Sequence, residues 1–281
     1  MSTIYSLWLQ GYDDAPDQVK TCLDRWNKLN PAYKFELLDL SDVQDHIKTL
    51  PLKISNITPQ SLSDIVRVAI LHKTGGIWVD ATVFPTKSLS EWLEETVGDS
   101  EFFSYKREAQ QKSPKDRPFS AWFLYATNKS KIIEKLWEET CRYWSIGHIP
   151  MTDQNKETYH EDPIAFMGLS QEVPNSPYPY HWLQHIFSYL EKTDASFAEI
   201  WHSCPDKSIT IPHQIQFLAR EELVNENTAG YLTEERIKSI VENSEMQKLN
   251  WRMEFPIDIM EKYSVRIPND IHGESFGPKF L

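Results

Sequence analysis

Apolar residues recur at three- and four-residue steps after Ser61, and this spacing predicts an amphipathic helix. The apolar positions are Leu62, Ile65, Val66, Ala69 and Ile70. Ser61 or Ser63 suits the start of this helix, and Gly75 and Gly76 suit its end, because glycine adopts the left-handed backbone that follows many helices. The apolar run 77–79 then predicts a short buried strand that delivers Asp80 to its carboxyl end.

The first forty residues predict a β-α-β unit. Residues 4–9 alternate weakly and predict a first strand, and residues 33–38 predict a second one. The helix between them has an apolar face of Val19, Cys22, Leu23 and Trp26, and the pair Asn30-Pro31 ends it. Such a unit is typical of the opening of a nucleotide-binding α/β layer.

The remaining chain continues the alternation of helices and strands. We expect helices near residues 41–50, 89–93, 130–144, 180–187 and 221–245, strands at 102–105, 119–126 and 208–212, and loops at 51–59, 106–118 and 145–180. His181 and His185 lie four residues apart, a spacing that a zinc pair can use, with packing or acceptor binding as the favoured alternatives.

Composition narrows the functional classes. A chain of 281 residues is long enough for one large domain. The net charge of −12 argues against a broad nucleic-acid surface. No run approaches the roughly 20 apolar residues of a membrane span, and the first residues lack the pattern of a signal peptide. Three widely separated cysteines suit reduced thiols, so a cytoplasmic location is expected.

The central segment carries a specific motif. It reads Ser-Asp-x-x-Arg through Asp64 and Arg67, then Gly-Gly-x-x-x-Asp ending at Asp80. This arrangement resembles the glycosyltransferases of family 32, above all the group of capsular polysaccharide synthesis proteins, and more distantly the glucosylating clostridial toxins. The run Trp78–Thr82 resembles the Trp-Ile-Asp-Ala-Thr of that group, whereas other members have Asp-x-Asp. Thr82 therefore stands where those members carry a second carboxylate.

The resemblance implies a fold and an activity. The fold is α/β, with a GT-A type, Rossmann-like sheet that binds nucleotide sugar, is flanked by helices and is joined to a helical and loop acceptor region. Residues 1–281 form one domain, in which 1–125 are the nucleotide-sugar-binding half and 126–281 are mainly the acceptor side and tail. The implied activity is retaining transfer of a hexose-type sugar from a UDP-sugar to a saccharide acceptor, in bacterial capsule or surface polysaccharide synthesis. The expected acceptor is lipid-linked, and peripheral association with the inner face of the plasma membrane is expected to bring the enzyme to it.

The resemblance also assigns roles to single residues. Asp64, Arg67 and Asp80 are the expected catalytic residues. Trp8, Asp64, Arg67, Thr82, Lys248 and Lys279 are expected to bind the donor, with Trp8 stacking on uracil. Asp80 and His272 are the expected ligands of Mn²⁺ or Mg²⁺. Because Thr82 cannot supply a negative charge, metal affinity is expected to be weaker than in an Asp-x-Asp enzyme.

Simpler interpretations exist for each residue. Asp64 and Arg67 can form an exposed ion pair within the helix, worth a few tenths of a kcal/mol. Asp80 can cap a turn, and Trp8 can belong to the core. A glycoside hydrolase with two carboxylates is one functional alternative. A non-catalytic sugar-nucleotide-binding protein is another, because Thr82 departs from the Asp-x-Asp pattern. The joint spacing of these residues favours glycosyl transfer.

Overall fold

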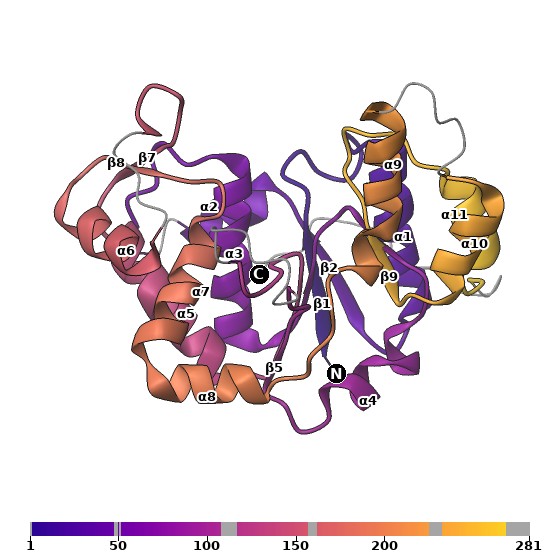
Figure 1. The fold of residues 1–281 in the computed structure, drawn as a ribbon, viewed down its shortest axis with the longest axis horizontal. Helices are drawn as coiled ribbons and strands as arrows, with labels where there is room; N and C mark the ends of the chain where they lie inside the picture. The colour runs from indigo at the N-terminus through magenta and orange to yellow at the C-terminus, as the bar shows by residue number, and fades with distance from the viewer. Residues whose placement is uncertain are drawn as a thin grey trace. The chain divides into compact units, whose positions relative to one another are not determined.

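The computed structural model shows an α/β protein in which helices alternate with short strands (Figure 1). The structure describes residues 2–47, 50, 52–107, 117–156, 162–224 and 232–267. The α/β class predicted from the sequence is confirmed. Within those ranges, no helix is both long enough and apolar enough to span a bilayer.

The largest sheet has five strands in the order β2-β1-β3-β6-β5. Their bounds are β1 (Thr3–Leu7), β2 (Lys34–Leu38), β3 (Gly76–Val79), β5 (Phe102–Phe103) and β6 (Phe123–Ala126). β1 and β2 are parallel, with Thr3 opposite Lys34, and helix α1 (Asp17–Leu29) is the crossover that a parallel pair requires. β5 and β6 are antiparallel, with Phe102 opposite Ala126. The predicted opening β-α-β unit is confirmed.

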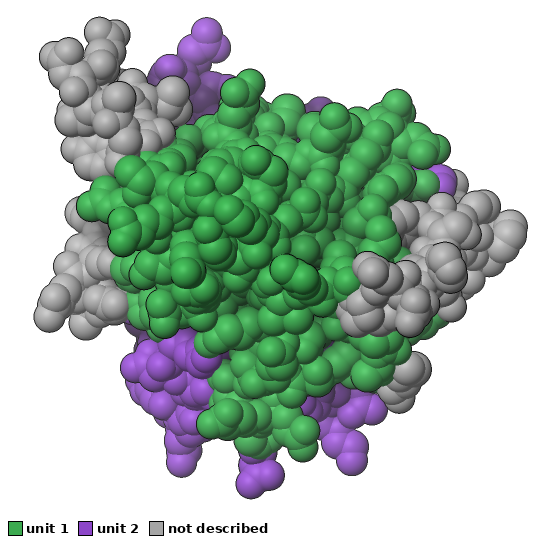
Figure 2. Space-filling view, turned by 90° about the vertical axis from the view of Figure 1, so that its right-hand side faces the viewer, with its two compact units in different colours: residues 1–40, 79–98, 208–281 green, residues 41–78, 99–207 purple. Residues whose placement is uncertain are grey.

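The chain folds into two compact units, each made of separate segments (Figure 2). Unit 1 contains residues 1–40, 79–98 and 208–281, and unit 2 contains residues 41–78 and 99–207. The chain passes from unit 2 to unit 1 within β3, between Trp78 and Val79. The single domain with halves 1–125 and 126–281 stays a prediction.

Unit 1 is organised by helix α1. The side chains of the predicted apolar face, Val19, Cys22, Leu23 and Trp26, are buried. Trp26 Nε1 donates a hydrogen bond of 2.8 Å to the carbonyl of Val83, which ties α1 to β4 (Val83–Pro85). β4 pairs antiparallel with β9 (Met246–Lys248), and Val83 lies opposite Lys248. The other elements of unit 1 are η1 (Leu89–Glu91), α4 (Leu93–Val97), η4 (Ile211–His213), α9 (Gln214–Val224), α10 (Glu234–Glu242) and α11 (Ile257–Tyr263).

The helices of unit 2 pack mainly around one central helix, α5 (Lys131–Trp144). α3 (Pro59–Thr74) contacts α5, and α5 contacts α6 (Pro163–Glu172), α7 (Trp182–Thr193) and α8 (Ala195–Ser203). The unit also contains most of α2 (Leu40–Ile47) and a parallel pair of β7 (His148–Pro150) with β8 (Ser176–Tyr178).

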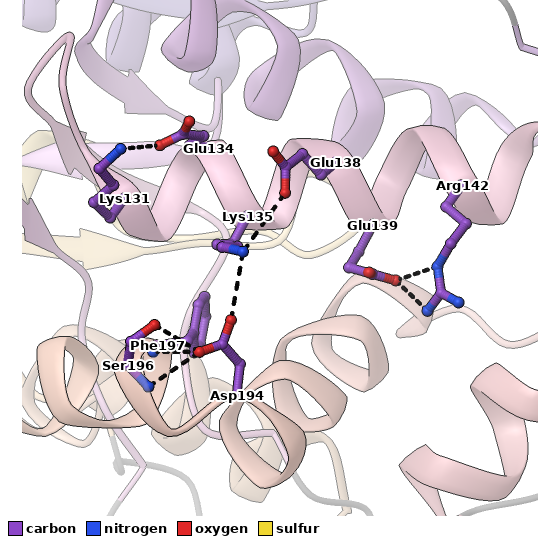
Figure 3. A network of polar contacts seen from close by, with 9 residues as sticks. All are labelled: Lys131, Glu134, Lys135, Glu138, Glu139, Arg142, Asp194, Ser196 and Phe197. Carbon is purple, nitrogen blue, oxygen red and sulfur yellow. Dashed lines mark hydrogen bonds and ion pairs between the residues drawn. The ribbon is translucent and has the colours of Figure 1, made fainter.

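Charged side chains line α5 and reach the start of α8 (Figure 3). Lys135 Nζ lies 3.6 Å from a carboxylate oxygen of Asp194. The other carboxylate oxygen of Asp194 accepts hydrogen bonds from the backbone N–H groups of Ser196 and Phe197. Exposed ion pairs contribute little to stability, whereas a helix N-cap contributes about 1 kcal/mol. Asp194 therefore acts mainly as the cap of α8.

The structure corrects several predicted elements. The segment 145–180 was predicted as loops but contains α6, β7 and β8. Asp162 caps α6 by accepting from two backbone N–H groups, and the following proline suits the first helical turn. The predicted strand 208–212 is a bridge residue followed by η4, and the predicted strand 119–126 is regular only from Phe123. The predicted helix 221–245 corresponds to the end of α9 and to α10.

Candidate functional site

Helix α3 carries the first pair of predicted site residues. Thr58, and neither of the predicted serines 61 and 63, caps it by accepting a hydrogen bond from the Ser61 N–H, and Pro59 follows the cap. The side chains of Asp64 and Arg67 both belong to the interior, with residue exposures of 9% and 6%. The predicted helix is therefore confirmed, but its two charged residues do not lie on a solvated face.

Arg67 is held by several acceptors within unit 2. Its Nη1 lies 3.2 Å from a carboxylate oxygen of Asp64 and donates to the carbonyl of Ala121 at 2.6 Å. Its Nη2 donates to Ser63 Oγ at 3.0 Å, and its guanidinium carbon lies 5.1 Å from the centre of the Trp78 ring. Removal of one partner from a buried ion pair costs about 3–5 kcal/mol, far more than an exposed pair. The ion pair within the helix, which was the simpler interpretation, is therefore confirmed, but its expected exposure and weakness are wrong.

Two glycines join α3 to β3. Gly75 has φ +65° and Gly76 has φ +111°, both in the region that other residues rarely adopt. A Cβ at Gly75 would lie 2.6 Å from the backbone nitrogen of Asn128, so the backbone passes too closely for any side chain. β3 ends at Val79, and the Asp80 carbonyl accepts a hydrogen bond from the Val83 N–H at 2.9 Å. Asp80 thus begins the turn between β3 and β4, as its position after the strand predicted.

A lysine from the far end of the chain completes this turn. Lys248 Nζ lies 3.1 Å from a carboxylate oxygen of Asp80 and donates a hydrogen bond to Thr82 Oγ1. The β4–β9 ladder sets this position, because Val83 lies opposite Lys248 and the Leu249 N–H donates to the Thr82 carbonyl at 2.9 Å. The side chains of Lys248 and Asp80 are 18% and 24% exposed. All these residues belong to unit 1.

Trp8 lies just after β1 in the same unit. Its backbone N–H donates to the Leu38 carbonyl at 3.0 Å, and its ring is 6.0 Å from that of Trp251 at an interplanar angle of 87°. The Trp8 indole N–H is buried and has no hydrogen-bond partner among the residues that the structure describes. Trp251 is 42% exposed, and the Arg252 guanidinium carbon lies 4.4 Å from its ring centre. The segment 248–252 therefore contacts both Trp8 and the Asp80 turn.

Some predicted site residues thus come together within each unit. Asp80, Thr82 and Lys248 form one cluster in unit 1, and Asp64 and Arg67 form a pair in unit 2. Their assigned roles in binding and catalysis stay predictions. His272 and Lys279 lie outside the described residues. Sequence reasoning missed the contact of Trp251 with Trp8 and that of Lys248 with Asp80, because no periodicity links positions so far apart in the chain.

The residues present at the Asp80 turn do not form a good site for a divalent cation. Mn²⁺ and Mg²⁺ prefer several oxygen ligands with net negative charge. Asp80 supplies one carboxylate, Thr82 supplies a neutral hydroxyl, and an ammonium group already contacts both. Within the described ranges, no group of three or more histidine, cysteine, aspartate or glutamate side chains is placed to hold a metal. The side chains of His181 and His185, whose spacing a zinc pair can use, do not belong to such a group among the described residues. His185 Nδ1 instead contacts the backbone oxygen of His181 at 2.9 Å.

Known proteins resemble this chain in sequence and in fold. A relative from Acanthamoeba polyphaga mimivirus, "Uncharacterized glycosyltransferase L373", is 26% identical over 102 residues. The match covers 32% of this chain and only 38% of that relative. The solved structure "PaToxG Glycosyltransferase" covers 72% of this chain and 74% of its own, at 15% identity and a TM-score of 0.40. Mouse xyloside xylosyltransferase 1, apo form, covers 91% and 99% at 10% identity and a TM-score of 0.44. No conclusion about function follows from likenesses in fold as distant as these two.

The match to a protein family is more extensive. The model described as "Capsular polysaccharide synthesis protein" matches residues 1–152, more than half of the 281 residues. The matched region contains Trp8, α3 with Asp64 and Arg67, and the turn at Asp80. The chain belongs to the capsular polysaccharide synthesis protein family.

Proposed function

We propose that this protein is a GT-A type glycosyltransferase that moves a hexose-type sugar from a UDP-sugar to a saccharide acceptor in bacterial capsule or surface polysaccharide synthesis. The observation that carries the proposal is the ammonium group of Lys248, held 3.1 Å from Asp80 at the carboxyl end of β3. Ligands of open α/β sheets bind at the carboxyl ends of strands. Membership of the family and the mimivirus relative named as a glycosyltransferase support the same reaction class.

The reaction demands a fixed positive charge. As the bond between the anomeric carbon and the phosphate oxygen breaks, its electron pair stays on the oxygen, and negative charge grows on the leaving diphosphate. An ammonium group that is already held in place stabilises this charge without reorganisation. Lys248 is proposed to donate hydrogen bonds to the diphosphate while Asp80 and Thr82 hold its side chain. For a retaining reaction without an enzyme nucleophile, the acceptor oxygen bonds to the anomeric carbon from the front face, and the proton of its hydroxyl passes to a phosphate oxygen.

Other residues complete the proposed roles. Trp8 is proposed to stack on uracil through the face of its ring. Asp64 is proposed to accept hydrogen bonds from sugar hydroxyls, and Arg67 to bind a phosphate or sugar oxygen. The proposed acceptor is a lipid-linked saccharide, which the enzyme reaches through peripheral association with the inner face of the plasma membrane.

The test is release of nucleotide from a panel of UDP-, GDP- and CMP-sugars without acceptor. We expect slow release of UDP from one donor. The rate of this release should fall about 100-fold in Asp80→Asn, because the displaced Lys248 ammonium group no longer stabilises the negative charge that grows on the diphosphate. Asp258→Asn changes an exposed aspartate on α11 of the same unit and is the matched control, with release unchanged. The proposal would be refuted if the protein neither binds nor releases any nucleotide of the panel. Binding of a UDP-sugar without turnover on any acceptor would instead identify a binding protein.

A further inference from the structure

The Lys248 side chain has two polar partners that hold its ammonium group in place. Its ammonium group touches the Asp80 carboxylate and the Thr82 hydroxyl at once. These are the two positions at which Asp-x-Asp relatives carry their carboxylates. The cation of this cluster is therefore supplied by the chain itself.

The ladder between β4 and β9 fixes the backbone position of Lys248. Val83, the residue after Thr82, lies opposite Lys248 in the antiparallel pair. Thr82 also accepts the backbone hydrogen bond from the Leu249 N–H. The lysine backbone is thus fixed by two neighbouring sheet contacts, and only its side chain needs to be ordered. The Lys248 side chain is 18% exposed, so it is not sealed inside the fold.

A divalent cation would compete with this arrangement. To bind Asp80 it would either displace the ammonium group or lie beside it, and two positive charges at such short range repel strongly. Thr82 adds no negative charge to offset that repulsion. A Thr–Lys combination therefore favours a bound ammonium group, whereas two carboxylates favour a metal ion.

We infer that Lys248, positioned by Asp80 and Thr82, neutralises the donor diphosphate in place of a divalent cation, so that donor binding requires no metal. The inference rests on the proposed glycosyltransferase function. Lys248 acts only by donating hydrogen bonds to the diphosphate. The bond between the anomeric carbon and the phosphate oxygen breaks with its electrons on that oxygen, the acceptor oxygen forms a bond to the anomeric carbon, and the proton of the acceptor hydroxyl passes to the phosphate. Asp80 and Thr82 act on the reaction only through the lysine.

Calorimetric titration with UDP tests the inference without depending on turnover. We expect the wild-type protein to bind UDP with the same dissociation constant, within about twofold, in EDTA and in MnCl₂. Lys248→Met should weaken binding at least tenfold in both conditions, because a charge-assisted contact is lost. Lys238→Met, which removes an exposed lysine of α10 in the same unit, should bind like the wild type.

A double variant, Thr82→Asp with Lys248→Met, provides the converse test. It replaces the ammonium group by a second carboxylate, so UDP binding should become dependent on Mn²⁺. Circular dichroism and the thermal unfolding midpoint establish that each variant is folded. Wild-type binding that is lost in EDTA and restored by MnCl₂ overturns the inference and leaves the proposed function intact. Absence of binding to UDP and to every other nucleotide of the panel, with and without metal, overturns both.

Discussion

Replacement of Gly75 by alanine tests the connection on which the Asp64 to Asp80 segment depends. Gly75 ends α3 with φ +65° and ψ −166°, a region that essentially only glycine adopts. An alanine there costs about 1–3 kcal/mol in backbone strain. Its Cβ would also lie 2.6 Å from the Asn128 nitrogen and 2.9 Å from the Thr127 carbonyl carbon, both backbone atoms that cannot rotate away. Forced overpacking adds about 1–3 kcal/mol, so the expected loss of unfolding free energy is about 2–6 kcal/mol.

Gly98 is a matched control in the same chain. It ends α4 with φ +49° and ψ −126°, and its N–H donates to the Glu94 carbonyl at 3.0 Å, as the Gly75 N–H donates to Leu71 at 2.9 Å. A Cβ at Gly98 would meet nothing within 4 Å. Gly98→Ala therefore carries the backbone strain without the clash. The difference between the two variants should be about 1–3 kcal/mol, which is the steric contribution alone.

The assay is urea unfolding followed by tryptophan fluorescence and by circular dichroism. If the two signals give coincident transitions, the free energy of unfolding can be calculated with a two-state model. If the slope of that free energy against urea concentration is unchanged, the substitution has altered stability and not the unfolded state. Equal losses for Gly75→Ala and Gly98→Ala would refute the argument from the close backbone approach. A Gly75→Ala variant too unstable to purify beside a well-folded Gly98→Ala would agree with it, since total domain stability is only about 5–15 kcal/mol.

The remaining predictions concern stability and its dependence on pH. Asp194→Ala should lower the unfolding free energy by about 1 kcal/mol through loss of the α8 cap, and Lys135→Ala should lower it by less, as urea midpoints at neutral pH will show. The hydrogen bond from the Ser196 hydroxyl, followed by that from the Phe197 backbone N–H, holds the pKa of Asp194 below its ordinary value, so the contribution of Asp194 is present above pH 4 and should fade as pH falls further. Burial raises the pKa of the Cys22 thiol to about 12, so stability should fall as pH rises from about 9 towards 12, and Cys22→Ala should flatten that slope; an equal slope in both proteins would contradict this. Trp26→Phe should cost about 1–3 kcal/mol by leaving the Val83 carbonyl without its indole donor, and a cost below 0.5 kcal/mol in the same urea assay would show that this bond contributes little.

Local patterns predicted the elements around the site well. The three- and four-residue spacing after Ser61 predicted α3, and the two glycines predicted its end, because both signals act within one or two turns of the chain. The segment 145–180 was predicted as loops because its polar and proline residues outweighed the helix start at Asp162. Short strands such as β9 were also missed, since three residues give no measurable alternation and form only against a partner.

The sequence by itself determined the α/β class, the helix that carries Asp64 and Arg67, and the position of Asp80 at the end of a strand. These follow from spacing, capping residues and glycines, which are local properties of the chain. Only the tertiary structure decided that Asp64 and Arg67 are buried, and that Lys248 contacts Asp80 and Thr82. Burial and cross-strand register depend on which distant segments pack together, and the chain order does not encode that pairing in any short pattern.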